Sequence, residues 1–147
     1  VGVMMLTPTS GAFAADFAKL DITGQDFSNG NYQGKDFTQV IAKGTNFQKS
    51  NLQGCHFAKA NLVNADFSGA DLTGASFVEA VLDGVSLKDA IAVRTDFTAS
   101  ILDVDDFENV DLTSSLWPSK LAVMLCNELK GKNPTTGVDS QGSILCP

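Results

Sequence analysis

The fold is decided by a stretch that reads ANLVNADFSGADLTG over residues 60–74. Its large apolar residues, Leu62, Phe67 and Leu72, stand five positions apart, and an alanine precedes each of them by two positions. The same register runs unbroken over residues 15–114, contains nine of the ten phenylalanines and includes none of the four prolines. The chain is therefore built on a five-residue internal repeat.

A period of five fits neither the period of about 3.6 of a helix nor the period of about two of a strand. No regular element can bury both the large and the small position on one face, so the chain must turn a corner in every repeat. Four short sides close a square coil of twenty residues. The sequence thus predicts an all-β solenoid of about five coils, which pair backbone to backbone at about 4.8 Å.

Folding the register by twenty predicts four stacked walls inside this coil. Two opposite walls are mainly aromatic and the other two mainly aliphatic, which fills a narrow core with little void. The aromatic walls are Phe17, Phe37, Phe57, Phe77 and Phe97, facing Phe27, Phe47, Phe67, Leu87 and Phe107. The rule of a small residue two positions before each centre is broken at Leu20, Gln25, Lys35 and Asp105. Gly24, Gly34, Gly44, Gly54, Gly74 and Gly84 are expected at corners, where a positive φ is needed.

Residues 60–74 resemble the pentapeptide-repeat family, whose consensus is A(D/N)LXX. The resemblance covers residues 15–114, about two thirds of the chain. It implies a right-handed quadrilateral β-helix, with the least regular repeats at Gln25 and Lys35 near the start and at Asp105 near the end.

The open ends of a solenoid expose an unpaired edge, so caps are expected. After Trp117, Pro118 suits the first turn of a helix, and apolar residues follow at helical spacing. They are Leu121, Met124, Leu125, Cys126 and Leu129. We predict an amphipathic helix over 118–130 that ends near Gly131 and covers the last coil. Residues 132–147 are predicted to be loop, with Ile144 and Leu145 against the helix, so that 115–147 form a cap and tail.

The three cysteines have different expected roles. A disulfide between Cys126 and Cys146 would fasten the tail to the cap and close a loop of about 20 residues, worth about 3 kcal/mol. Such a bond indicates an oxidising compartment, and the alternative is two reduced thiols in a cytosolic protein. Cys55 holds a small inward position and is expected to be a free, inert thiol.

Residues 1–14 are apolar and uncharged and end in Ala12-Phe13-Ala14 before the repeat begins. They are either the tail of an export signal with a small-residue cleavage site or an N-terminal cap. Together with the ending from Asn133 to Pro147, this segment resembles pentapeptide-repeat proteins of the chloroplast thylakoid lumen, which have cyanobacterial relatives. That resemblance implies import with a transit peptide and a lumenal location.

Composition and motifs exclude most kinds of chemistry. With 10 Lys and Arg against 17 Asp and Glu, the net charge of −7 disfavours nucleic acid and anionic membranes as partners. No apolar run approaches the roughly 18 residues of a membrane span. His56 is expected to point outward beside the inward Cys55, so the two cannot share a metal. We therefore predict no catalytic residue, no metal and no cofactor. The acidic cluster of Asp103, Asp105, Asp106, Glu108 and Asp111 is a candidate cation site, or else a solvated acidic face.

The surface pattern leaves two candidate interaction features. Residues 15–64 carry a net charge of +1, whereas 65–114 carry eleven acids against Lys88 and Arg94. The outward position before the centre also forms an apolar stripe on one wall, through Ile41, Val81 and Ile101. We expect this stripe, or the acidic side chains Asp103 and Asp106, to dock an unidentified protein partner.

These features predict a non-catalytic scaffold or protein-interaction module of the thylakoid lumen, a monomer rather than a dimer. The alternative is an acidic DNA-mimic inhibitor of a topoisomerase, because some acidic members of the resembled family act in that way. It would need negative charge along the whole rod, and the near-neutral residues 15–64 argue against it.

Overall fold

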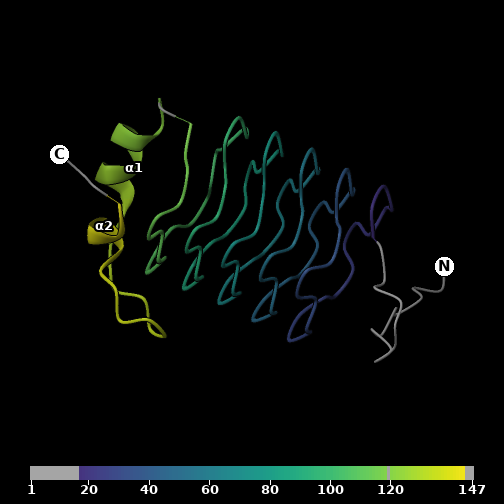
Figure 1. Ribbon diagram of the computed structural model, residues 1–147, viewed down its shortest axis with the longest axis horizontal. Helices are drawn as coiled ribbons and strands as arrows, with labels where there is room; N and C mark the ends of the chain where they lie inside the picture. Colours follow the sequence, from purple (N-terminus) through teal and green to yellow (C-terminus); the bar gives the residue numbers. More distant parts are fainter. Residues whose placement is uncertain (1–16, 119, 145–147) are drawn as a thin grey trace.

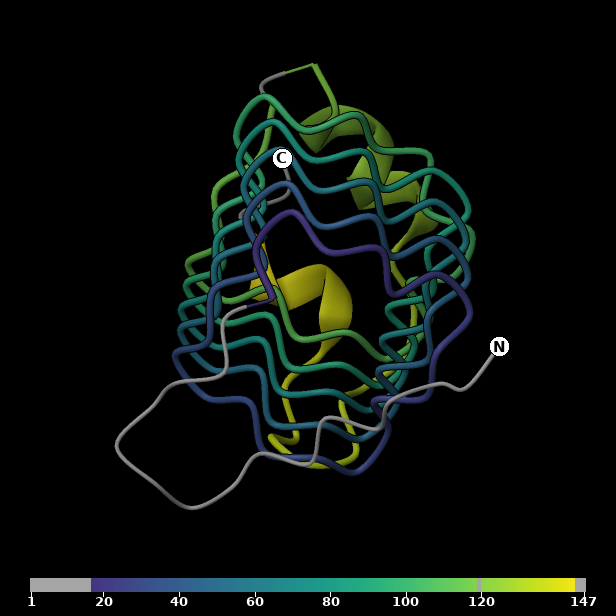
Figure 2. The same cartoon turned by 90° about the vertical axis from the view of Figure 1, so that its right-hand side faces the viewer.

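The computed structural model describes residues 17–118 and 120–144. Apart from residues 101–105, each five-residue repeat forms a single β-bridge residue and a two-residue turn. The bridges are parallel and join residues twenty positions apart, from Asp21 with Ile41 to Asp96 with Leu116. Figure 1 shows the resulting stack of coils edge on, and Figure 2 looks along it and shows the four-sided outline. The predicted quadrilateral β-solenoid is confirmed, with sides only one bridge residue long.

The corners depend on a left-handed backbone at the second residue after each centre. The six glycines expected there all have positive φ, for example 71° at Gly74. Other repeats place ordinary residues in this conformation, such as Asn64 at 60° and Lys59 at 58°. Positive φ normally costs a residue with a Cβ about 1–2 kcal/mol, so the repeat must stabilise each corner by other means.

Stacked side chains fill the interior along the predicted walls. Phe37, Phe57 and Phe77 lie with ring centroids 4.6 and 4.9 Å apart and nearly parallel planes. Rings of the facing wall meet them edge to face, as Phe47 does with Phe57 at 5.7 Å and 85°. Trp117 continues the first wall by stacking on Phe97 at 4.2 Å. Both arrangements are favourable for aromatic rings, so the core is continuous from Phe17 to Trp117.

The four residues that break the rule of a small inward side chain are also less buried than the alanines at this position. Alanines at this position, such as Ala70 and Ala80, are fully buried, whereas Leu20 is 41% exposed. Gln25 and Lys35 are only partly buried, yet their coils keep the regular bridges and turns. Asp105 is exposed, and its coil alone loses a turn. Irregularity is therefore confined to the C-terminal side of the described solenoid.

Two helices follow the solenoid and lie at one end of the stack (Figure 1). The helix predicted over 118–130 is shorter than expected, because α1 spans Ala122–Glu128. It ends at Glu128, and the next residue, Leu129, has an extended backbone. The carbonyl of Lys130 then accepts a hydrogen bond from the Asn109 N–H. Met124, predicted on the buried face, is 64% exposed, and Leu125 is the buried residue of α1.

The segment predicted as loop after residue 131 is also partly ordered into elements. An antiparallel bridge joins Lys132 to Asp139, and α2 spans Ser140–Ser143. Asp139 caps α2 by accepting a hydrogen bond from the Gly142 N–H. Ile144, which was predicted to lie against the helix, is partly buried against the core, and Leu145 lies outside the described residues.

Asn133 joins this tail to the solenoid and was not predicted to matter. It is 1% exposed, and its side-chain amide donates to the carbonyls of Asp89, Ala90 and Asn109. Its carbonyl oxygen accepts from the N–H groups of Thr135 and Thr136. One buried amide thus satisfies backbone groups of both the last coils and the tail, as buried polar groups require.

Candidate functional site

The one missing corner of the described solenoid lies at Val104. Every other repeat of residues 17–114 has positive φ at this position, and Val104 does not. Valine is β-branched and strongly disfavours the left-handed region, so the turn does not close. As a consequence Asp105, not Asp106, donates its N–H to the Val85 carbonyl. The side at 101–107 therefore departs from the regular coil, and Leu102 and Phe107 are only partly buried.

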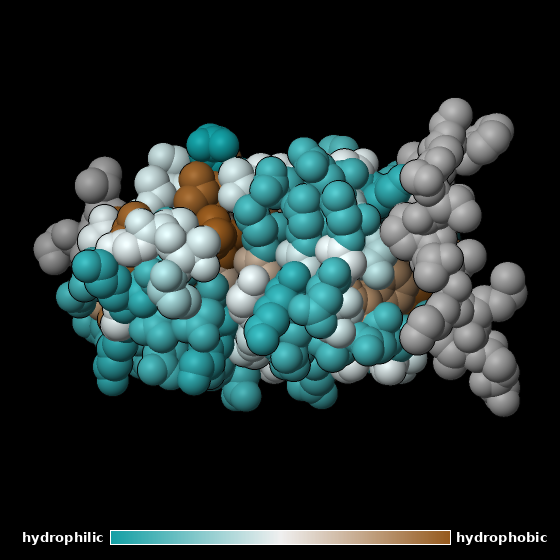
Figure 3. Space-filling model, turned by 90° about the horizontal axis from the view of Figure 1, so that it is seen from below, coloured by the Kyte–Doolittle hydropathy of each residue, from teal (hydrophilic) through white to brown (hydrophobic). Residues whose placement is uncertain are grey.

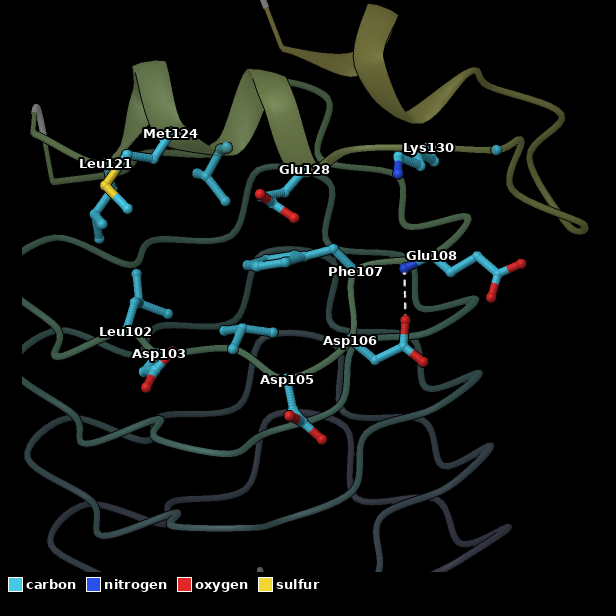
Figure 4. A pocket seen from close by; sticks show the side chains of 13 residues that line it. Leu102, Asp103, Asp105, Asp106, Phe107, Glu108, Leu121, Met124, Glu128 and Lys130 are labelled. Atoms are coloured by element: carbon cyan, nitrogen blue, oxygen red, sulfur yellow. Dashed lines mark hydrogen bonds between the residues drawn. The ribbon is translucent and has the colours of Figure 1, made fainter.

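A cavity of about 760 Å³ lies between this irregular side and α1. Leu102, Val104 and Phe107 form its apolar lining from the coil, and Leu121 and Leu125 line it from the start and middle of α1. Figure 4 shows Glu128 extending from α1 toward Phe107, whereas Asp105 and Glu108 point away from the cavity. We call this cavity the end groove. Its volume falls in the range of about 300–1,000 Å³ that is typical of ligand-binding clefts.

The lining of the end groove is strongly acidic. Asp103, Asp105, Asp106, Glu108 and Glu128 border it, against the single cation Lys130. Over residues 17–118 and 120–144, the only ion pair joins Lys88 Nζ to Glu108 Oε2 at 3.3 Å. This contact, by hydrogen bond and then by charge, raises the pKa of Lys88. The other four acids of the groove thus have no internal cation within salt-bridge distance.

The predicted interaction residues lie in two separate places on the surface. Ile41, Val81 and Ile101 share one bridge ladder, as predicted, and Ile41 and Ile101 are 39% and 59% exposed. Asn61 separates Ile41 from Val81, which is itself half-buried, so the stripe is interrupted. Asp103 and Asp106 lie instead on the end groove, which Ile101 adjoins in sequence. Figure 3 shows one face on which hydrophilic residues cover most of the solenoid, with hydrophobic surface toward its C-terminal end and again near its N-terminal end.

The acidic cluster does not assemble into a metal site. Asp111 is buried and accepts hydrogen bonds from the N–H and hydroxyl of Thr113. Asp106 accepts from the Glu108 N–H in a turn of the same kind. In the part of the chain that the structure describes, no three His, Cys, Asp or Glu side chains are grouped so that they could hold a metal ion.

Cys55 and His56 lie on opposite sides of the wall, as predicted. The Cys55 thiol is fully buried and donates to the Tyr32 carbonyl at 2.9 Å, whereas His56 is exposed. Burial raises the pKa of the Cys55 thiol to about 12, so the nucleophilic thiolate is not populated at neutral pH. Cys126 lies in α1, and Cys146 falls outside the described residues, so their pairing stays a prediction.

The groove residues that sequence reasoning missed are Glu128 at the end of α1 and Lys130 after it. The signal for the groove was nevertheless present in the sequence. It was a β-branched residue at a corner next to an aspartate at a small inward position.

Within the described residues, no helix has the length and apolarity that crossing a membrane requires.

Comparisons with known proteins agree with this architecture. The family model described as pentapeptide repeats matches residues 21–57, 50–89 and 60–98, in eight copies. The crystal structure of a pentapeptide repeat protein from the thylakoid lumen of Arabidopsis thaliana is 30% identical, with a TM-score of 0.74. That match covers 88% of this chain and 90% of the Arabidopsis chain. No curated protein is similar enough to the chain to count as a match.

A more distant structural match is HetL, a pentapeptide repeat protein involved in heterocyst differentiation regulation in the cyanobacterium Nostoc sp. strain PCC 7120. It is 22% identical, with a TM-score of 0.58, and the match covers 69% of this chain and 42% of HetL. At this identity the likeness concerns the fold alone. The repeat model and the Arabidopsis structure together show that the chain belongs to the pentapeptide-repeat family.

Proposed function

We propose that this protein is a non-catalytic protein-interaction module of the thylakoid lumen. The observation that carries the proposal is the filled interior, since the stacked rings from Phe17 to Trp117 leave the outer surface and the end groove as the places for contact. The same described surface brings together no metal-ligating cluster. Repeat proteins of this kind commonly use extended outer surfaces for binding.

Finer features of the fold belong to the same proposal. We expect right-handed winding, about five coils, and a cap formed by the C-terminal helices of a monomer. A disulfide between Cys126 and Cys146 is expected to tie the tail to α1. Its support is the hydrogen bond from Gln141 Nε2 to the Cys126 carbonyl at 3.1 Å, which brings the two segments together.

The lumenal location rests on similarity to the Arabidopsis lumen protein. The expected disulfide is compatible with an oxidising compartment. Residues 1–14, the candidate signal remnant or N-terminal cap, lie outside the described residues. The direct test is protease protection of the protein in isolated thylakoids. Digestion in intact, washed thylakoids would contradict a lumenal location, whereas digestion only after detergent is expected.

The binding role is tested by substituting the stripe. Ile41→Ser and Ile101→Ser are expected to leave the fold intact, because both side chains are exposed, and to weaken capture of a cross-linkable partner from lumen extract. Lys43→Ser, an exposed substitution next to the stripe, is the matched control. If the captured proteins are the same for all variants, the stripe does not bind a partner.

A gyrase supercoiling assay tests the competing role as an acidic DNA mimic. We expect no inhibition, because the acidic residues concentrate in 65–114 and do not extend along the whole rod. Inhibition that disappears when the acids of 65–114 are neutralised would replace the proposed function.

A further inference from the structure

The last coil has one side whose backbone is left unpaired. In the preceding coil, the N–H groups of Leu82, Gly84 and Leu87 donate to the carbonyls of Ile101, Asp103 and Asp106. The equivalent donors one coil later are Leu102, Val104 and Phe107. Within the described residues these three N–H groups donate to no acceptor of the protein.

Neighbouring sides of the same coil are covered by the tail. The Asn109 N–H donates to the Lys130 carbonyl, and the Leu112 N–H donates to Ser143 Oγ at 3.0 Å. Ala99 and Ser114 on the two other sides each leave one N–H without an acceptor among the described residues, and on the side at 101–107 both Leu102 and Val104 do so. The side at 101–107 is therefore the most open part of this end. Unpaired edges of β-structure are templates on which an extended peptide adds a further strand.

This unpaired side borders the end groove, so a peptide placed on it would also meet side chains. Leu102, Phe107 and Leu125 offer apolar surface, and the volume of about 760 Å³ admits several residues. Asp103, Asp106 and Glu128 add carboxylates that have no cation within salt-bridge distance among the described residues. The opening therefore combines backbone donors, apolar side chains and an excess of negative charge.

We propose that the end groove binds an extended segment of another protein in which apolar side chains alternate with Lys or Arg. The peptide carbonyls accept hydrogen bonds from the N–H groups of Leu102, Val104 and Phe107. The apolar side chains of the peptide contact the apolar side chains of the groove. The cations of the peptide face Asp103, Asp106 and Glu128. Alternation matches this arrangement because successive side chains of a strand point to opposite sides. The inference rests on the proposed interaction role and assigns it a site and a class of partner.

The probe is a fluorescein-labelled peptide of alternating Lys and Leu, six residues long, titrated into the full chain and followed by fluorescence anisotropy. Binding is expected to weaken as the NaCl concentration is raised, because salt screens the attraction between the peptide lysines and the carboxylates of the end groove. A peptide of alternating Glu and Leu and one of alternating Lys and Ser should both bind much more weakly. Equal binding of the Glu and Lys peptides would overturn the proposal.

The site is assigned with a matched pair of variants. Glu128→Gln should weaken binding of the Lys-Leu peptide by about fivefold, whereas Glu79→Gln, an exposed acid away from the groove, should not change it. Backbone pairing has its own signature in amide hydrogen exchange. The amides of Leu102, Val104 and Phe107 should become protected when the peptide binds, with the interior Phe57 amide unchanged.

Two results would reject the groove without affecting the proposed function. One is peptide binding that Glu128→Gln and Glu79→Gln alter equally. The other is a concentration-dependent dimer in which the amides at 101–107 are already protected without peptide, since a second copy would then occupy the opening. Partner capture that depends on Ile41 and Ile101 would stand in either case. Capture that is unchanged in the Ile41→Ser and Ile101→Ser variants, together with intact peptide binding, would instead reject the stripe.

Discussion

At the scale of single residues, the inward small position follows a common hydrogen-bonding rule. Thr45 Oγ1 donates to the Ile22 carbonyl and Thr95 Oγ1 donates to the Leu72 carbonyl, both at 2.8 Å. Cys55 Sγ makes the equivalent contact to the Tyr32 carbonyl, which is likewise 23 residues earlier. Ser50 and Ser100 at the same position donate instead to the carbonyl three residues earlier. A buried polar atom is therefore tolerated here because a backbone carbonyl of the same or the preceding coil accepts from it.

This rule predicts how Cys55 responds to substitution. Cys55→Thr should change the free energy of unfolding by less than about 1 kcal/mol, because the threonine hydroxyl can replace the thiol as donor. Cys55→Leu should destabilise by about 1–3 kcal/mol, because it overfills a closed site. Urea unfolding followed by circular dichroism measures both values. Equal stability of the Leu and Thr variants would show that the position is not tightly packed.

Thiol titration tests the state of the same residue and of the other two cysteines. Because burial raises the pKa of Cys55 to about 12, the native protein should not react with a disulfide reagent at pH 8. Denaturation without a reductant should release one reactive thiol if Cys126 and Cys146 are paired. Three thiols under those conditions would contradict the disulfide.

At the scale of elements, Asn133 holds the tail to the last coils. Asn133→Ala is expected to destabilise by about 2–3 kcal/mol, since it leaves buried carbonyls of the solenoid without their donor. Asn133→Asp should be worse, because a carboxylate oxygen would then face the carbonyls of Ala90 and Asn109. Asn127→Ala, an exposed substitution on α1, is the control. Urea unfolding gives the stability, and unchanged stability of both Asn133 variants would show that the tail does not cap the coils.

The broken corner at Val104 supports a second prediction at this scale. Val104→Asn together with Asp105→Ala should regularise the coil, because Asn29, Asn64 and Asn109 already adopt positive φ at equivalent corners. We expect a gain of about 1 kcal/mol, or about 3 °C in Tm. The reverse substitution Asn64→Val should lose about as much. A loss of stability in the regularised variant would mean that the irregular side is itself stabilising.

The solenoid could be predicted from the sequence more fully than the C-terminal segment, because only the solenoid follows a periodic pattern of burial. Bulky side chains at every fifth position leave one way to bury themselves, so the walls, corners and exceptions at Leu20 and Asp105 followed from spacing. The C-terminal segment is held by hydrogen bonds such as those of Asn133 and Ser143 across the chain, and no periodicity encodes them. The end groove lies where the last coil meets α1. The repeat register marks Val104 as an unusual corner residue, but no pattern in the sequence places Glu128 at the groove.

At the scale of the whole molecule, aspartates at the outward position before each centre recur along the solenoid as turn acceptors. Asp21, Asp26 and Asp36 each accept a hydrogen bond from the N–H two residues later. Hydrogen bonds from Thr23, Ser28 and Thr38, respectively, hold the pKa of these carboxyls below the ordinary 3.8. Asn31, Asn46 and Asn51 make the same turn contact without a titrating group.

This repeated turn predicts how the solenoid responds to acid. A carboxyl whose pKa is lower in the folded state contributes stability above its unfolded pKa and loses it as the pH falls through the folded value. Stability should therefore decline below about pH 4. The triple variant Asp21→Asn, Asp26→Asn and Asp36→Asn keeps the acceptors but cannot be protonated there, so its acid unfolding midpoint should shift to lower pH. Urea unfolding at pH 7 and pH 3 measures the difference, and identical acid sensitivity of both proteins would show that other carboxyls control it.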